Sequence, residues 1–314
     1  MNREESGAHD HHHHHHEGAA GIRQAFFLNL LFTVIEIAGG ILTNSMAILA
    51  DAIHDLGDSF ALGSAWYFER LSGKAGDEHY SYGYQRFSLL GALINIIILI
   101  VGSFFILSQA IPRLFYPEPS HAPGMIGFAV LGILVNGVAA LRLRGKEGMN
   151  VTMVTWHLLE DVLGWAAILV TGLVLLFWQV HWLDAFLSIL ITGYVLFNVL
   201  RNLKPTMTIF LQGIPGSVNL PAIEEEVGRL DGVGSIHHAH VWTLDGHDHI
   251  LTMHVVIPCD FDRERILHLK ERIRDIMASH GIDHSTVEFE FEGEECRIMG
   301  RNCRNGGQNG SCRR

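Results

Sequence analysis

The chain has 314 residues, 48% of them hydrophobic, with a mean hydropathy of +0.23 and a formal net charge of −11. A chain this apolar that also has a charged C-terminal third is typical of a membrane domain followed by a soluble domain. The acidic balance and the lack of a basic surface exclude nucleic acid as a partner. We therefore expect a protein embedded in membrane lipid.

The first 21 residues are polar and rich in histidine, with an unbroken run from His11 to His16. Such a run either collects metal ions loosely or is an affinity tag. In either case we expect residues 1–21 to be disordered.

Six apolar segments between residues 22 and 205 are each long enough to cross a membrane. We expect five of the spans at about 24–43, 46–68, 87–111, 125–141 and 183–203. The other one, fifth in order, contains residues 155–165 and ends at a turn near 179. An even number of spans puts both termini on one side, and the loops on that side carry nearly all the lysines and arginines of the domain. The sequence therefore predicts that both termini are cytoplasmic.

The second span contains the stretch LADAIHDLGD, which puts ionisable residues into a membrane helix. His54 and Asp58 are four residues apart, so they lie one turn apart on the same face, and Asp51 extends this polar stripe. Ionisable groups at membrane depth are costly and mark an ion or proton path. These residues are therefore candidates for a transport site.

The fifth span repeats the pattern in TWHLLEDVLGW, where His157 and Asp161 have the same four-residue spacing. Two helices that each offer an imidazole and a carboxylate can supply the four ligands of a tetrahedral metal site, which suits Zn²⁺.

Three further acids are accessory or pathway candidates. Asp55 and Glu160 each stand beside a motif residue and are rotated by about 100° from it on a helix. They point either towards a water-filled cavity or towards the ion, where extra oxygen ligands would favour a more oxygen-seeking metal. Glu36 in the first span is a pathway residue or a hydrogen-bonding partner of a neighbouring helix.

Residues 206–292 are predicted to form a small α+β domain with the order αββαβ. The expected elements are a helix at 220–230, strands at 235–243 and 249–257 joined by an Asp245-Gly246 turn, a helix at 262–280 and a strand at 285–291. A disordered tail is expected at 293–314. The four cysteines show no paired framework, and in a domain that faces the cytoplasm they are expected to be thiols.

Several histidines lie on the predicted strands. His238 and His240 are two residues apart and share a face, His254 lies on the partner strand, and His284 and Glu290 belong to the last strand. Together they form a candidate second metal site. The alternative is that several of them are only exposed strand residues.

The order of SMAILADAIHDLGD, YGYQRFSLLGALIN, WHLLEDVLGW, HHAHVWTLDG and HSTVEFEFEGEEC resembles the cation diffusion facilitator family, in particular its bacterial zinc-efflux members. The resemblance extends from about Ile22 to Cys296. It implies a homodimeric metal/proton antiporter with six transmembrane helices and a metallochaperone-like cytoplasmic domain, located in the bacterial inner membrane.

Carried over by position, the resemblance assigns transport ligands and a cytoplasmic zinc site. The transport ligands are His54, Asp58, His157 and Asp161, and the cytoplasmic positions are His240, His254, His284 and Glu290. Zn²⁺ would then be both the substrate and a regulatory ligand, with Cd²⁺ and Co²⁺ as other possible substrates. Asp77 and His79, in the loop after the second span, match a further family site only weakly.

Two other functions fit part of the pattern. A membrane-embedded zinc enzyme needs an open coordination position and a general base, and the sequence has no HExxH motif. A metal-sensing scaffold would explain the soluble domain but leaves the intramembrane ligands without a purpose. The transporter is therefore the favoured reading.

Overall fold

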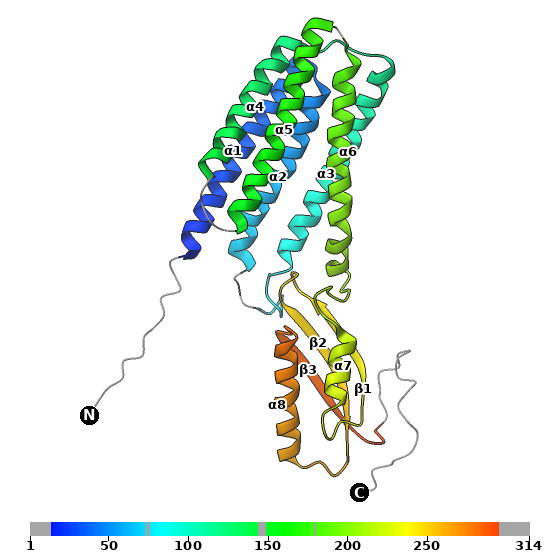
Figure 1. The fold of residues 1–314 in the computed structure, drawn as a ribbon. Helices are drawn as coiled ribbons and strands as arrows, with labels where there is room; N and C mark the ends of the chain where they lie inside the picture. The colour runs from blue at the N-terminus through cyan, green and yellow to red at the C-terminus, as the bar shows by residue number, and fades with distance from the viewer. Residues whose placement is uncertain (1–13, 73, 75, 144–148, 179, 295–314) are drawn as a thin grey trace, which may run out of the picture. The chain divides into compact units, whose positions relative to one another are not determined.

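The computed structural model describes residues 14–72, 74, 76–143, 149–178 and 180–294. The chain divides into two compact units, Met1–Leu203 and Lys204–Arg314, and Figure 1 shows the helices of the first and the small sheet of the second. Residues 1–13 and 295–314 lie outside the described residues, and so do the predictions of disorder made for them.

The described part of the first unit is built from six long helices. They are α1 (His14–Thr43), α2 (Met46–Ser72), α3 (Phe87–Phe115), α4 (Ala122–Leu143), α5 (Met149–Trp178) and α6 (Trp182–Phe210), of which α6 continues into the second unit. Helix α1 begins inside the segment that was expected to be disordered. Helix α3 continues through Pro112, beyond its expected end. A proline there removes one backbone hydrogen bond close to the end of the helix, so the last turn can still form.

Five helices are long and apolar enough to cross a membrane. The qualifying stretches are Ala25–Thr43, Phe87–Phe115, Ala122–Leu143, Val154–Trp178 and Trp182–Phe210. Helix α2 does not qualify, and it carries three aspartates in its first half. Many large apolar side chains on these helices are exposed, among them Phe104, Leu163 and Phe177. A surface of this kind suits lipid rather than water.

Helices α1, α2, α4 and α5 pack around Trp165, which is buried on α5. Figure 1 shows these four helices as a group, with α3 and α6 beside each other. The Trp165 ring lies so close to Gly132 of α4 that a Cβ atom at Gly132 would come within 2.2 Å of it. Only glycine permits this approach, which brings α4 and α5 together.

The N-terminus of α2 is held by a buried carboxylate from α6. The Asp184 carboxylate accepts hydrogen bonds from the Met46 amide at 2.7 Å and the Ser45 hydroxyl at 2.6 Å. Ser120, which precedes α4, donates a hydrogen bond from its hydroxyl to the Asp184 carboxylate at 3.3 Å. Because the first amides of a helix have no partner within the helix, an anion here satisfies them and interacts favourably with the helix dipole.

The second unit contains the helix, strand, strand, helix, strand order that the sequence predicts. Its elements are α7 (Leu220–Gly228), β1 (Ser235–Thr243), β2 (His249–Ile257), α8 (Arg263–Ser279) and β3 (His284–Phe291). The sheet has the order β1-β2-β3, with β1 and β2 antiparallel and β2 and β3 parallel. Apolar residues of α7 and α8 pack on one face of it.

Local sequence signals set the boundaries of these elements. Asn219 and Asp262 cap the first turns of α7 and α8 by accepting backbone hydrogen bonds. In the turn between β1 and β2, Gly246 has φ +104°, a conformation that favours glycine. The Asp245 carboxylate accepts hydrogen bonds from the backbone amides of His247 and Asp248.

Cys259 is the one cysteine among the described residues, two residues after β2, and its Sγ atom lies 3.3 Å from the backbone oxygen of Glu292. A domain that faces the cytoplasm normally keeps its cysteines reduced, and the expectation of thiols stays a prediction. Cys296, Cys303 and Cys312 lie outside the described residues.

Candidate metal sites

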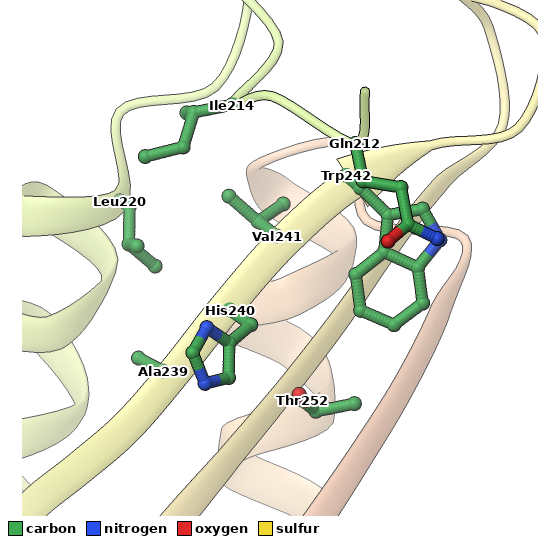
Figure 2. A pocket seen from close by; sticks show the side chains of 8 residues that line it. All are labelled: Gln212, Ile214, Leu220, Ala239, His240, Val241, Trp242 and Thr252. Carbon is green, nitrogen blue, oxygen red and sulfur yellow. The ribbon is translucent and has the colours of Figure 1, made fainter. Parts of the chain in front are cut away.

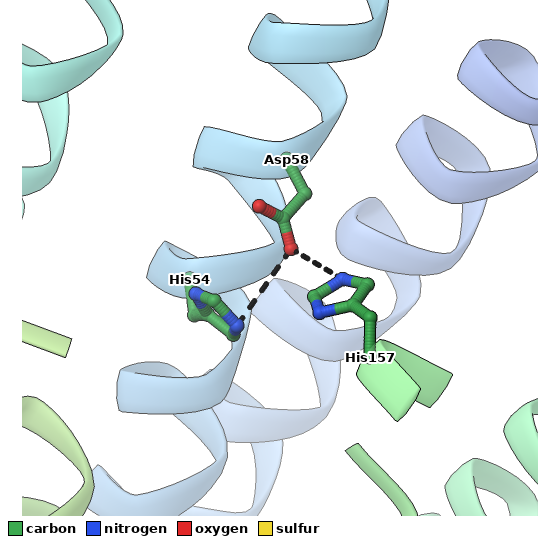
Figure 3. A group of neighbouring side chains, drawn as sticks. All are labelled: His54, Asp58 and His157. Atoms are coloured by element: carbon green, nitrogen blue, oxygen red, sulfur yellow. Dashed lines mark ion pairs between the residues drawn. The ribbon is translucent and has the colours of Figure 1, made fainter. Parts of the chain in front are cut away.

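Side chains from α2 and α5 form a group of potential metal ligands. One ligand atom from each of His54, Asp58 and His157 lies within 4.8 Å of the others. The His157 Nε2 atom is 2.9 Å from the Asp58 Oδ2 atom, and the His54 Nε2 atom is 3.7 Å from the same oxygen. Figure 3 shows the His157 imidazole reaching across from α5 to the Asp58 carboxylate of α2.

The spacing of these atoms is compatible with tetrahedral coordination. With metal–ligand bonds of about 2.0–2.1 Å, two ligand atoms of a tetrahedral zinc site lie about 3.3 Å apart. The Asp161 Oδ2 atom is 3.9 Å from the His157 Nε2 atom. The side chains of Asp58, His157 and Asp161 are 27%, 40% and 11% exposed, so the group is not sealed inside the helix bundle.

Three acids that the sequence assigned as accessory residues are buried next to this group. Asp51 and Asp55 on α2 are buried, and Glu36 on α1 is only 1% exposed. The Glu36 carboxyl group forms a hydrogen bond with that of Asp55, which requires a proton on one of the two, and it interacts electrostatically with Asp51. Asp51 lies beside Gly164 of α5, where a Cβ atom would be 3.5 Å from the Asp51 Oδ1 atom.

Glu160 is placed differently from these three acids. It lies on an exposed part of α5, and the Tyr194 hydroxyl of α6 donates to its Oε1 atom at 2.5 Å. Glu160 therefore links α5 to α6, whereas Asp161, its neighbour in sequence, faces His157.

A second group of potential ligands lies on the sheet of the small domain. It consists of His237, His254 and Glu290. The Glu290 carboxylate is 2.6 Å from the His254 Nδ1 atom and 3.0 Å from the His237 Nε2 atom. His254 and Glu290 are both buried, and the outer nitrogen of His254 is 3.4 Å from the Glu288 carboxylate. Two imidazoles and a carboxylate are ligands that suit Zn²⁺.

Sequence reasoning missed His237 because of an irregularity in β1. Strict alternation would put His237 and His238 on opposite faces of the sheet. The register shifts between His237 and His240, and His238 has φ +51°. This bulge lets both rings lie beside the His254 ring, at centroid distances of 5.2 Å each. The pair of adjacent histidines was the only sequence signal.

The other two predicted cytoplasmic ligands do not join this three-residue group. His240 is exposed and lines a cavity of about 320 Å³ with Gln212, Trp242 and Thr252, and Figure 2 shows its ring beside β1. His284 begins β3 and pairs with Ile250 of β2, whereas Glu288 pairs with His254. At about 3.3 Å per residue, His284 therefore lies about 13 Å along the strand from the level of His254.

The loop after α2 uses Asp77 to build a turn. The Tyr84 hydroxyl donates to the Asp77 Oδ2 atom at 2.6 Å, and the amides of His79 and Tyr80 donate to its Oδ1 atom. These hydrogen bonds, that from Tyr84 first, lower the pKa of Asp77. The same contact raises the pKa of Tyr84. The Asp77 carboxylate thus already has three donors around it.

A helical membrane domain with ligands on two facing helices, followed by a small α+β domain with its own ligands, is the architecture of a cation transporter. Residues 22–211 match the family model described as the cation efflux transmembrane domain, and residues 215–292 match that of the cation efflux protein cytoplasmic domain. The chain therefore belongs to the cation efflux, or cation diffusion facilitator, family, whose members are transporters rather than enzymes.

Relatives over most of the chain carry transporter names. The zinc transporter ZitB of Pectobacterium atrosepticum is 31% identical over 91% of this chain and 89% of its own length. The metal cation efflux system protein CzcD of Cupriavidus metallidurans is 30% identical over 90% and 89%. A protein of Bacillus velezensis named "Cadmium, cobalt and zinc/H(+)-K(+) antiporter" is 29% identical over 90% and 91%. The family and these names together support efflux of a divalent metal.

Proposed function

We propose that the protein is a homodimeric antiporter that exports Zn²⁺ from the cytoplasm in exchange for protons, with Cd²⁺ and Co²⁺ as further candidate substrates. The observation that carries the proposal is the approach of His157 on α5 to Asp58 on α2, with His54 and Asp161 beside them. These four side chains are the proposed ligands of the transported ion. The names of the relatives support zinc as the first candidate.

Coupling to protons follows from the ligand chemistry. Metal binding needs neutral imidazoles and ionised carboxylates, so Zn²⁺ and protons compete for the same side chains. A histidine, with an ordinary pKa of about 6.5, can exchange its proton at physiological pH. In the inward-facing state the site loads Zn²⁺ and releases protons, and in the outward-facing state protons displace the ion. A site that is never without both metal and protons avoids moving bare carboxylates through the membrane.

The accessory acids are further proton-binding groups beside the proposed site. Bound Zn²⁺ balances the charges of Asp58 and Asp161. Glu36, Asp51 and Asp55 are buried in the helix bundle close to one another. Because an uncompensated buried carboxylate is costly, these three groups favour their protonated form or a cation beside them. Glu160 is an accessory residue of another kind, since it pairs with Tyr194 of α6.

We propose that α2 is the sixth membrane span. It has 27 residues and is therefore about 40 Å long, enough to cross a bilayer. Its aspartates Asp51 and Asp55 are buried against other helices, which is where a membrane protein keeps ionisable groups. With six spans, the positive loops support a cytoplasmic location for both termini and the α+β domain. The proposed location is the bacterial inner membrane.

In the cytoplasmic domain we propose that His254 and Glu290, together with His237, hold a regulatory Zn²⁺ ion. The domain that carries them matches the family's cytoplasmic domain, which is named for dimerisation. A metal bound there could shift the equilibrium between conformations of the homodimer only if its affinity differs between them. His240 and His284 belong to the same sheet but lie apart from this group within one chain.

The test is metal uptake into proteoliposomes with an imposed proton gradient. Wild-type protein should take up Zn²⁺ at a rate that follows the gradient, and His157→Ala should abolish the uptake. His181→Ala, which removes a histidine outside the proposed site, is the matched control and should keep it. Uptake that ignores the gradient, or that survives in His157→Ala, would contradict the proposal.

A further inference from the structure

A polar side chain of α1 reaches the turn of α2 that carries the proposed ligands. The Asn29 Nδ2 atom donates to the backbone oxygen of Asp55 at 3.1 Å and to the Ser59 hydroxyl at 3.0 Å. Asp55 directly follows His54, and Ser59 directly follows Asp58. The amide of Asn29 therefore holds the residue after each of the two α2 ligands.

Because of the geometry of an α-helix, this contact fixes the direction in which the side chains of α2 point. Residues 55 and 59 lie one turn apart and form a stripe, rotated by about 100° from the stripe of residues 54 and 58. When α1 holds the first stripe, the rotation of α2 about its axis is fixed. The second stripe then faces α5, where the His157 imidazole meets the Asp58 carboxylate.

The hydrogen bonds of Asn29 are partly buried, and two of the residues that take part in them lie deeper in the bundle. Thr33 and Ser59 are fully or almost fully buried. Their hydroxyl oxygens are 3.3 Å apart, and the Thr33 hydroxyl also donates to the backbone oxygen of Asn29 at 2.9 Å. In a low-dielectric interior such bonds are strong, and a buried group left without its partner is costly. The network therefore resists both rotation and sliding of α2 against α1.

We propose that Asn29 is a positioning residue for the transport site, which sets the direction of His54 and Asp58 without touching the ion. The inference rests on the transport function proposed above. Zn²⁺ requires short bonds of about 2.0–2.1 Å to every ligand, so a small rotation of α2 weakens its coordination. Cd²⁺ is a larger ion and tolerates a wider arrangement of the same ligands. Loss of Asn29 should therefore weaken Zn²⁺ more than Cd²⁺.

The experiment measures uptake of Zn²⁺ and of Cd²⁺ in proteoliposomes for the wild type, Asn29→Ala and Ser59→Ala. In Asn29→Ala the KM for Zn²⁺ should rise about tenfold or more, as is typical when a group that orients metal ligands is removed. Its kcat should stay within about twofold of the wild type, and its ratio of kcat/KM for Zn²⁺ to that for Cd²⁺ should fall. Ser59→Ala keeps the bond to the Asp55 carbonyl and should show a smaller change in the same direction.

The control variant is Asn136→Ala, which removes the same type of side chain from a buried position on α4. It should keep the KM and the ratio of the wild type, because a general loss of stability does not change metal preference. Asp58→Ala distinguishes a failure of the proposed transport function from a failure of the positioning role. If wild-type uptake does not depend on Asp58, the proposed transport function fails.

Two results would overturn the positioning role alone. The first is uptake that depends on Asp58 while Asn29→Ala keeps the wild-type KM and metal ratio. The second is an unchanged metal ratio in Ser59→Ala. This variant decides if Asn29→Ala does not fold.

Discussion

The Nε2 atom of His157 lies 2.9 Å from the Oδ2 atom of Asp58, across the interface of α5 and α2. At this distance the imidazole and the carboxylate can share a proton. A metal ion bound by both groups must replace that proton. The same pair of atoms that binds the ion is therefore joined by a proton when the ion is absent, which is the physical core of an exchange mechanism.

Replacing Asp58 by asparagine keeps the shape of the side chain but removes its charge. Asp58 is the carboxylate that both imidazoles approach, at 2.9 Å and 3.7 Å. An amide is a much poorer ligand for Zn²⁺ than a carboxylate, so we expect Asp58→Asn to lower the initial rate of Zn²⁺ uptake by about 100-fold or more. Glu118→Gln, at an exposed acid paired with Arg113, should change it by less than about twofold. Equal rates in both variants would remove Asp58 from the transport site.

Acid should weaken Zn²⁺ binding to the membrane site. A histidine must be neutral to bind metal, so protons compete with Zn²⁺ for both imidazoles. The logarithm of the association constant should therefore fall with pH, by up to about two per pH unit where both imidazoles of the metal-free site are protonated. The measurement is Zn²⁺ titration of the detergent-solubilised protein between about pH 8 and pH 5.5, in a Glu290→Gln background that weakens the cytoplasmic group. A pH-independent affinity would contradict competition between metal and protons.

The pairing of candidate ligands within each membrane helix was predictable because the helix has a fixed period. His54 and Asp58 are brought to one face by local geometry alone, and so are His157 and Asp161. Only the approach of the two helices to each other needed the fold. The αββαβ order was equally accessible, since alternation and turn residues such as Asp245 and Gly246 are local signals.

What sequence reasoning missed depends on contacts between distant segments or on irregular backbone. Asn29 is a polar residue in an apolar segment of the sequence, and its contact with α2 is visible only in the fold. Asp184 acts on the first turn of α2, far away in the chain. His237 reaches the cytoplasmic group through a bulge, and no residue type marks a bulge reliably.

The Tyr84→Phe substitution should raise the pKa of Asp77 towards its ordinary value. The Tyr84 hydroxyl is the first cause of the lowered pKa. A carboxyl group with a lowered pKa in the folded state stabilises the fold above its unfolded pKa, and this contribution is lost as the pH falls through the folded pKa. In Tyr84→Phe this contribution should therefore be smaller, and its loss should be complete at a higher pH. NMR titration of the Asp77 carboxyl carbon measures the shift.

Tyr80→Phe is the control for this titration. It removes a neighbouring hydroxyl but keeps the backbone amide that donates to Asp77. The Asp77 pKa should stay low in Tyr80→Phe. An equal rise in both variants would mean that the ring packing of the loop, and not the Tyr84 hydrogen bond, sets the pKa.

Asp184→Ala should destabilise the membrane domain. The substitution leaves the Ser45 hydroxyl and the amides of Met46 and Ala47 without their buried acceptor. Each buried group that loses its partner costs about 1–3 kcal/mol, so we expect a fall in Tm of several degrees in a thermal unfolding scan. Glu118→Ala breaks an exposed pair worth less than about 1 kcal/mol and should leave Tm nearly unchanged. A wild-type Tm in Asp184→Ala would show that these groups find other partners.

The two possible cytoplasmic ligand sets can be separated by comparing His237 with His240. His237 lies 3.0 Å from the Glu290 carboxylate, whereas His240 is exposed and lines a separate cavity. If the three-residue group binds the metal, His237→Ala should weaken Zn²⁺ binding by about tenfold or more, and His240→Ala should leave it within about twofold. Calorimetric titration of the full chain in an Asp58→Ala, His157→Ala background removes the membrane group, and binding by the run from His11 to His16 is common to all variants. The reverse order, with His240→Ala the weaker binder, would favour the ligand set implied by family resemblance, and it would mean that ion binding rearranges β1 around its bulge.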